Sequence, residues 1–220
     1  MAIKVVLTGA TGMVGEGVLF ECLNNNEVSE VLIVNRKPYD LQHPKLSQLV
    51  VPDFFRLSES KSQIEGYDAC FFCAGVSSVG MNAEKYRYIT YDTTLSFAQA
   101  FLDANPGSVF TYVSGSHTDS TESGSMAWAR VKGKTENDLM RLAFKAVYNF
   151  RPGVMLPMSG QKNWKTIYKW MGQAVKLVAP NAVLSVGDVG KAMIKATTKG
   201  YQRHILEVAD IRILSDSQPV

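Results

Sequence analysis

The sequence predicts an α/β fold: a doubly wound parallel sheet with helices on both faces and a small helical appendage at the C-terminal end. Three observations lead to this class. The apolar runs are short and continuous, as in strands that are covered on both faces. Segments with helical length and spacing alternate with these runs, which requires parallel strands joined by right-handed crossovers. A glycine-rich stretch separates the first expected strand from the first expected helix.

The elements follow in order along the chain. The expected strands are the runs rich in Val, Ile, Leu and Phe at residues 3–7, 31–34, 49–51, 69–72, 109–113 and 147–150. The expected helices are residues 13–24, 83–104 and 125–144, followed after residue 153 by helices near 163–178 and 188–199 and a short apolar piece near 205–209. We expect residues 1–220 to form a single domain, whose portion from about 152 to 220 lies on the substrate side of the sheet's carboxyl edge.

The composition narrows the class of function and the compartment. With 46% hydrophobic and 20% charged residues, the 220-residue chain can bury one sizeable core. A net charge of +3 is far below the clustered charge of nucleic-acid-binding proteins, so no nucleic-acid partner is expected. Cys22, Cys70 and Cys73 form no disulfide framework, and no histidine cluster completes a metal site. With no signal-peptide pattern, the sequence predicts a cytoplasmic protein without a metal.

The segment from Lys162 to Val178 has lysines on one side and apolar residues on the other when drawn as a helix. A basic amphipathic helix suits a membrane surface or an acidic partner. The same pattern is ordinary for a surface helix that packs its apolar side and solvates its lysines. We adopt the second interpretation. Because no apolar run reaches the roughly 18 to 20 residues of a membrane span, we expect no membrane association.

Residues 7–17, LTGATGMVGEG, place three glycines at intervals of three directly after the first strand. A lone glycine motif is weak evidence, because glycine also serves ordinary tight turns. Within a strand, helix, strand unit it lets the backbone approach a pyrophosphate, which then sits at the positive end of the helix. This pattern predicts a Rossmann fold that binds a dinucleotide. The cofactor contacts expected in this turn are Gly9, Thr11, Gly12, Met13, Val14 and Gly15.

The end of the second strand indicates which nucleotide binds. A site for NAD usually places Asp or Glu about 20 residues after the glycines, where the carboxylate accepts hydrogen bonds from the ribose hydroxyls. Here the strand ends in Asn35, Arg36 and Lys37. Two cations attract the 2′-phosphate of NADP, and Arg36 can bind it through a bidentate fork. The sequence therefore predicts NADP(H) rather than NAD(H); the alternative is a solvated basic strand end.

Further motifs complete a recognisable pattern: TGATGMVG, NRKP, VVPDFF, FFCAG, ARVKGKTE and NFRPGVMLP. Together they resemble an atypical short-chain dehydrogenase/reductase, in particular the group similar to the HIV Tat-interactive protein and to NAD(P)H-binding NmrA-like proteins. The resemblance covers roughly residues 1–200. It implies that Asp53 and Phe54 border the adenine and that Ala74 and Gly75 line the central portion of the cofactor. It also implies contacts at the nicotinamide end from Arg151, Pro152, Gly153 and Val154.

The same resemblance points to a catalytic centre with one departure. Active reductases of this superfamily carry a tyrosine one helical turn before a lysine that holds the nicotinamide ribose and lowers the pKa of the tyrosine. A serine on the preceding strand end orients the substrate carbonyl. Lys132 matches the lysine and Ser114 the serine, with Ser116 as the neighbouring alternative. Trp128 stands in the tyrosine position, and its indole offers an N–H donor but no acid near neutral pH.

A proton for carbonyl reduction would therefore need another source. The candidates are tyrosines near the expected cleft, each of which also suits a packing role: Tyr86, Tyr88, Tyr91 and Tyr112. Trp128 alternatively stacks on the nicotinamide or on a substrate ring. Two functions stay open: an NADPH-dependent oxidoreductase acting on a small carbonyl-type substrate, and a non-catalytic NADP(H)-sensing protein that binds a protein partner. A third, sugar-nucleotide epimerase or dehydratase, usually needs a larger C-terminal lobe than the about 70 residues after Arg151.

Overall fold

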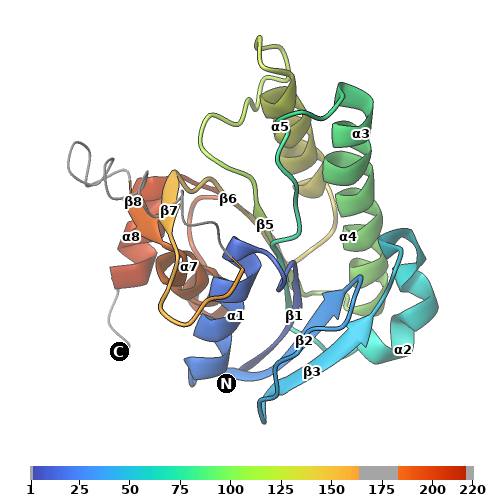
Figure 1. Ribbon diagram of the computed structural model, residues 1–220, viewed down its shortest axis with the longest axis vertical. Coiled ribbons are helices and arrows are strands. Elements are labelled where there is room, and N and C mark those ends of the chain that lie inside the picture. The colour runs from blue at the N-terminus through green and yellow to red at the C-terminus, as the bar shows by residue number, and fades with distance from the viewer. Residues whose placement is uncertain (1, 164–182, 217–220) are drawn as a thin grey trace.

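The computed structural model describes residues 2–163 and 183–216. Within these residues seven strands form one parallel sheet in the order β3-β2-β1-β4-β5-β6-β9 (Figure 1). Its strands are β1 (Ile3–Thr8), β2 (Val28–Asn35), β3 (Leu46–Val50), β4 (Ala69–Phe72), β5 (Val109–Val113), β6 (Ala146–Phe150) and β9 (Ile205–Leu206). The chain runs outward from β1 in one direction and then returns to β4 on its other side. This order confirms the predicted doubly wound Rossmann fold.

Helices cover both faces of the sheet (Figure 1). One face carries α1 (Met13–Asn24), α7 (Val186–Lys199) and α8 (Val208–Asp216). The other carries a 3₁₀ helix (Phe54–Ser60), α2 (Lys61–Ile64), α4 (Thr93–Ala104) and α5 (Ala127–Leu139). The short α3 (Ala83–Arg87) continues into α4 through a π-helical turn, Tyr88–Asp92. A second, two-stranded sheet pairs β7 (Val154–Leu156) with β8 (Val183–Ser185).

The apolar runs are continuous because the strands are covered by helices on both faces, as the sequence indicated. Side chains alternate along a strand, so in β4 Ala69 and Phe71 join the core under α1 and α7, while Cys70 and Phe72 join the core under α4. Cys73 packs toward the α1 side, opposite Cys70. Both cores therefore need apolar residues at successive positions of one strand.

The helix expected at residues 13–24 has those bounds in the structure, whereas the helix expected at 125–144 ends at Leu139. The second strand begins at Val28 rather than at residue 31. Its first residues pair with β1 through backbone groups although Ser29 is exposed, so the apolar pattern gives no sign of them. The short β7 and β8 and the helix α8 were not predicted. Most of the helix expected near 163–178 lies outside the described residues. In the described ranges no helix is long and apolar enough to cross a membrane.

Candidate nucleotide-binding and catalytic site

The glycine turn is built so that no side chain covers the start of α1. Gly9 has a positive φ of 78°, and a Cβ there would lie 2.7 Å from the carbonyl oxygen of Cys73. The N–H of Gly12 donates to the carbonyl oxygen of Gly9 at 2.9 Å, and the Gly12 carbonyl accepts the N–H of Glu16 at 2.9 Å. A Cβ on Gly15 would lie 2.1 Å from the Gly9 oxygen, so the helix packs directly on the turn. The backbone at the positive helix end is thereby open to an anion.

A cavity of about 370 Å³ lies at the carboxyl ends of β1, β2 and β4. That volume is within the range of small-molecule sites, about 300 to 1,000 Å³. The position is the switch point of the sheet, where β1 has β2 on one side and β4 on the other. The cavity brings together nine of the predicted cofactor contacts, namely Gly9, Thr11, Gly12, Asn35, Arg36, Asp53, Phe54, Ala74 and Gly75. Met13, Val14 and Gly15 form the first turn of α1 next to it.

The end of β2 supplies an unsatisfied donor to this cavity. Asn35 is only 4% exposed, and its Nδ2 has no hydrogen-bond partner among the described residues. Leaving a buried amide nitrogen unpaired costs about 1 to 3 kcal/mol, so the position suits a ligand that accepts a hydrogen bond. Arg36 also lines the cavity, and Lys37, next in the chain, is exposed. The open glycine turn and this orphaned donor together fit a nicotinamide dinucleotide.

The wall beside β3 is aromatic. The carboxylate of Asp53 caps the 3₁₀ helix by accepting the N–H of Phe55 at 3.1 Å. Phe54 is buried against Phe97, with ring centroids 5.2 Å apart. Phe55 stacks on Tyr88 with centroids 5.2 Å apart and an interplanar angle of 28°, and both rings line the cavity. This wall suits a flat ring. The sequence argument missed Phe55, and it considered Tyr88 as a proton donor or a packing residue but not as part of the cofactor cavity.

The β4 side of the cavity is held to β1 by a side chain. The N–H of Ala74 donates to Oγ1 of Thr8 at 3.1 Å, which fixes the loop that continues through Gly75. Cys73 lines the cavity next to this contact. Burial raises the pKa of its thiol to about 12, so the sulfur is neutral near pH 7. Cys73 therefore adds no negative charge to this side of the cavity.

The two predicted catalytic residues lie together at the carboxyl end of β5. The ammonium of Lys132, on α5, donates to the backbone carbonyl oxygen of Ser114. The Ser114 hydroxyl donates to the carboxylate of Glu136 and lies 3.2 Å from the carbonyl oxygen of Phe150. Glu136 is fully buried and stands one helical turn after Lys132. Sequence reasoning missed Glu136, although its spacing of four from Lys132 placed both on one face of the helix.

Arg151 is engaged inside the protein. It is 8% exposed, and its Nε and Nη2 donate to the two oxygens of Glu136 at 3.0 and 2.5 Å. Its Nη1 lies 3.3 Å from the carboxylate of Glu207. Pro152 follows and accepts the N–H of Ser116 at 3.1 Å through its carbonyl oxygen. The main chain then continues through Gly153 to Val154, the first residue of β7.

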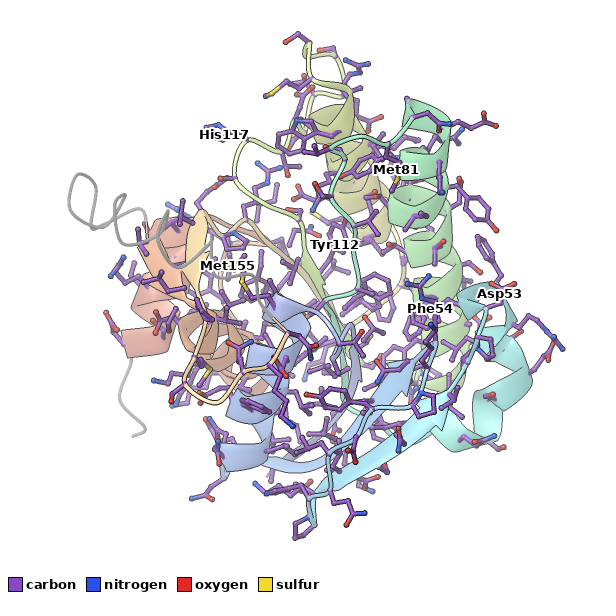
Figure 2. The ribbon with its side chains drawn as sticks, viewed as in Figure 1. Asp53, Phe54, Met81, Tyr112, His117 and Met155 are labelled. Atoms are coloured by element: carbon purple, nitrogen blue, oxygen red, sulfur yellow. The ribbon has the colours of Figure 1, made fainter. Side chains whose placement is uncertain are left out.

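The predicted site residues thus form two groups. Among the described residues, the lining of the cavity beside the glycine turn does not include Ser114, Lys132 or residues 151–154. In the view of Figure 2, Asp53 and Phe54 lie on one side of the strand ends, Met155 of β7 lies on the other, and Tyr112 lies between them. Trp128 is half-buried in the first turn of α5, one turn before Lys132. No group of His, Cys, Asp or Glu that suits a metal ion occurs in the described part of the chain.

The sheet order and the glycine turn define a nucleotide-binding protein of the oxidoreductase-like Rossmann type. The chain belongs to the NAD dependent epimerase/dehydratase family, whose model matches residues 5–124. Protein HTATIP2 of Rattus norvegicus is 30% identical over 156 residues, which are 70% of this chain and 63% of the rat protein. The mitochondrial protein fmp52 of Aspergillus clavatus is 30% identical over 165 residues, which are 72% of this chain and 68% of that protein. These relatives confirm the resemblance that the motifs indicated.

A solved structure shares this fold. The short chain dehydrogenase/reductase from Saccharomyces cerevisiae superimposes with a TM-score of 0.70 at 16% identity, covering 99% of this chain and 100% of that one. At this level of identity the likeness concerns the fold alone. The aligned region spans less than two thirds of the length of rat HTATIP2, at 63%.

Proposed function

We propose that the protein binds NADP(H) and uses NADPH to reduce a small carbonyl-type substrate. The observation that carries the proposal is the cavity at the switch point, where the glycine turn, the unpaired Nδ2 of Asn35 and the cation of Arg36 meet. Family membership supports a nicotinamide cofactor. The choice of NADP(H) over NAD(H) depends on the end of β2. A typical NAD site has a carboxylate there, whereas this chain has the cation of Arg36.

Each part of the cofactor has its expected partners. In this proposal the glycine turn holds the pyrophosphate, and Arg36 and Lys37 hold the 2′-phosphate. The remaining contacts are those of the sequence prediction: Asp53 and Phe54 at the adenine, Ala74 and Gly75 at the centre, and Lys132 at the ribose. At the nicotinamide end the contact comes from the main chain of residues 151–154, because the Arg151 side chain is paired with Glu136 and Glu207. The reduced nicotinamide supplies a hydride when it is bound.

The hydrogen bond between Ser114 and Glu136 bears on which hydroxyl orients a substrate. A serine has one proton to donate, and Ser114 directs it to the carboxylate of Glu136. Ser116, two residues further on, is only partly buried, and its backbone N–H is fixed to Pro152. This geometry favours Ser116 as the group that donates to a substrate carbonyl, with Ser114 holding the end of β5 in place.

Two observations favour the second candidate, a non-catalytic NADP(H)-sensing protein that changes its contact with a protein partner. Trp128 replaces the usual acid, and the Ser114 hydroxyl is already engaged. Such a protein would bind NADPH as tightly as a reductase does but would transfer no hydride. The two candidates therefore agree on the cofactor site and differ at α5.

Cofactor choice is tested by measuring NADPH and NADH binding calorimetrically at fixed, moderate salt. Wild type is expected to bind NADPH at least about tenfold more tightly, since a bidentate contact between arginine and phosphate contributes on the order of 1.5 to 3 kcal/mol. Arg36→Met should remove most of this preference and leave NADH binding nearly unchanged. Lys61→Met, an exposed cation on α2, is the matched control. Equal affinity of the wild type for both nucleotides would contradict the assignment.

Catalysis is tested with NADPH and a panel of aldehydes, ketones and one UDP-sugar, the last to detect epimerase chemistry. If only the proton donor is weakened, Trp128→Tyr should raise carbonyl reduction. A crystal soaked with NADPH would show what lies within about 3 to 4 Å of nicotinamide C4, the range of a reacting group. Tight NADPH binding without turnover, with C4 covered by Trp128, would favour the sensing protein.

The compartment is part of the proposal. We place the protein in the cytoplasm because its three cysteines are free thiols, which suits a reducing compartment. The fungal relative is named as mitochondrial. Fractionation of cells that express the full chain separates the two locations, and recovery in mitochondria would overturn this placement.

A further inference from the structure

We propose that Lys132 donates the proton that completes carbonyl reduction, in place of the missing tyrosine. The inference rests on the proposed reductase function. Carbonyl reduction would need a hydride at the carbonyl carbon, which a bound reduced nicotinamide would supply, and one proton at the carbonyl oxygen to form the hydroxyl. The Lys132 ammonium transfers that proton, becomes a neutral amine and regains a proton from water. Trp128, one turn earlier on the same helix face, has no such acid.

The tyrosines of this region are placed or engaged elsewhere. Tyr112 and Tyr86 are 2% and 3% exposed, and burial raises the pKa of both phenols. Tyr91 donates its hydroxyl to Asp138 at 2.7 Å. Tyr88 stands at the aromatic wall of the cavity, beside β3 rather than β5. Tyr112 does lie on β5 near Lys132, but its buried hydroxyl is hydrogen-bonded to Thr135, and its raised pKa disfavours release of the proton.

Lys132 has the geometry that a proton donor needs. Its Nζ reaches the carboxyl end of β5, where it donates to the Ser114 carbonyl oxygen. An ammonium has three N–H donors, so two remain for a ribose hydroxyl and a substrate oxygen. Lys132 is half-buried rather than fully buried, so water can still restore its proton after each turnover.

The surroundings of Lys132 favour loss of a proton near neutral pH. Burial lowers the pKa of its ammonium to about 8, close to the pH at which a general acid works best. The titratable groups that face it are Glu136 on the same helix and Tyr112 on β5, whose ring centroid is 5.9 Å from Nζ. Beyond them lie Tyr86 of α3, beside Tyr112, and Arg151, which pairs with Glu136. Because Arg151 neutralises Glu136, that carboxylate only partly offsets the effect of burial.

His117 is the rival donor because histidine is the side chain that most often serves as a general acid or base. It lies three residues after Ser114, with a left-handed φ of 66°. Its side chain is exposed, and Figure 2 shows it at the outer edge of the loop after β5, away from Tyr112. His117 therefore provides the control substitution.

The test compares the full-length wild type, Lys132→Arg and His117→Gln. Arginine keeps the positive charge that binds ribose but does not release a proton in this pH range. Single-turnover reduction of 4-nitrobenzaldehyde by NADPH is followed from pH 6 to 10, and NADPH affinity and thermal stability are measured in parallel. A second readout needs no cofactor: NMR titration of ¹⁵N-lysine-labelled apoprotein, with the Lys132 signal assigned by its loss in Lys132→Arg.

We expect the wild-type rate to fall as the pH rises through about 8, because the ammonium is the acid form, and the NMR titration to show the same midpoint. Lys132→Arg should lose at least about a hundredfold in rate, the usual contribution of a general acid, while NADPH affinity changes less than about threefold. His117→Gln should keep the wild-type profile. If Lys132→Arg does not fold, the wild type alone tests the inference. A rate that falls at the NMR midpoint of Lys132 supports it, and a rate that falls at a different pH contradicts it.

Three results would overturn the inference. A Lys132→Arg rate and pH profile like those of wild type would exclude Lys132 as the donor while leaving the reductase intact. Loss of the alkaline decline in His117→Gln would assign the role to His117. Tight NADPH binding without turnover by the wild type, on this aldehyde and on the wider panel, would remove the reductase function itself and with it the proton-donor role.

Discussion

Arg151 and Glu136 form a buried, bidentate ion pair that joins the residue after β6 to α5. Two nitrogens of the guanidinium meet the two carboxylate oxygens at 3.0 and 2.5 Å, and Glu136 is fully buried. The same carboxylate accepts a hydrogen bond from the Ser114 hydroxyl. The backbone carbonyl oxygen of Ser114 in turn accepts a hydrogen bond from the Lys132 ammonium. The pair therefore helps to hold both predicted catalytic residues in position.

Arg151→Met is expected to lower the free energy of unfolding by about 3 kcal/mol, because Glu136 would remain as an uncompensated buried charge. The double variant Arg151→Met, Glu136→Met should recover much of that loss. Arg141→Met, which removes an exposed partner of Asp138, should cost less than about 1 kcal/mol. Urea denaturation at pH 7 measures all three. A stability of Arg151→Met close to that of Arg141→Met would contradict the buried-pair account.

Gly9→Ala is expected to weaken NADPH binding by more than tenfold and to destabilise the fold by about 1 to 3 kcal/mol, because the new methyl group meets the backbone at Cys73. Gly107→Ala is the matched control: Gly107 has a similar φ of 83°, and a Cβ there meets nothing within 4 Å. The control should lose stability through backbone strain and keep its NADPH affinity. Calorimetric titration with NADPH separates the two effects. Equal NADPH affinity in both variants would mean that the glycine turn does not hold the cofactor.

The local parts of this fold could be predicted, because their signals lie in neighbouring residues. The bounds of α1 follow from an apolar strand, a glycine turn and helical spacing, and the structure has them at Met13 and Asn24. The expected strand starts at residues 3, 69 and 109 are confirmed, whereas those at 31, 49 and 147 were one to three residues late. In β2 this is because backbone pairing continues through exposed residues such as Ser29. The grouping of nine expected contacts around one cavity likewise follows from the rule that parallel strands present their carboxyl ends together.

The long-range parts could not be predicted from spacing. Arg151 was expected at the nicotinamide end, but its partners Glu136 and Glu207 lie 15 and 56 residues away in the sequence, and only the packed fold brings them to it. Glu16 was overlooked for the same reason. Its carboxylate is fully buried and accepts the Tyr39 hydroxyl together with the backbone of residues 162–163.

Glu16→Gln is expected to loosen the chain at residues 162–163. The Glu16 carboxylate accepts the N–H groups of Lys162 and Asn163 at 3.0 and 2.8 Å and the Tyr39 hydroxyl at 2.9 Å. An amide has one acceptor oxygen and a donor nitrogen, so part of this set is lost, at a cost of about 2 kcal/mol. Hydrogen exchange at these amides should accelerate at least about tenfold. Glu21→Gln, half-buried on the same helix, should leave their exchange unchanged.

The stability of the protein should depend on pH through Lys132. Its folded-state pKa of about 8 lies below the ordinary value of 10.5. Between these values the unfolded chain binds a proton that the folded protein does not, so stability rises with pH. We compare wild type with Lys132→Met by urea denaturation from pH 7 to 9.5, because all other titrating groups are common to both. Above pH 8, the free energy of unfolding of the wild type should rise relative to that of the variant by up to about 1 kcal/mol per pH unit. A constant difference across this range would show that Lys132 keeps its ordinary pKa, and would leave the proton-donor role without its electrostatic support.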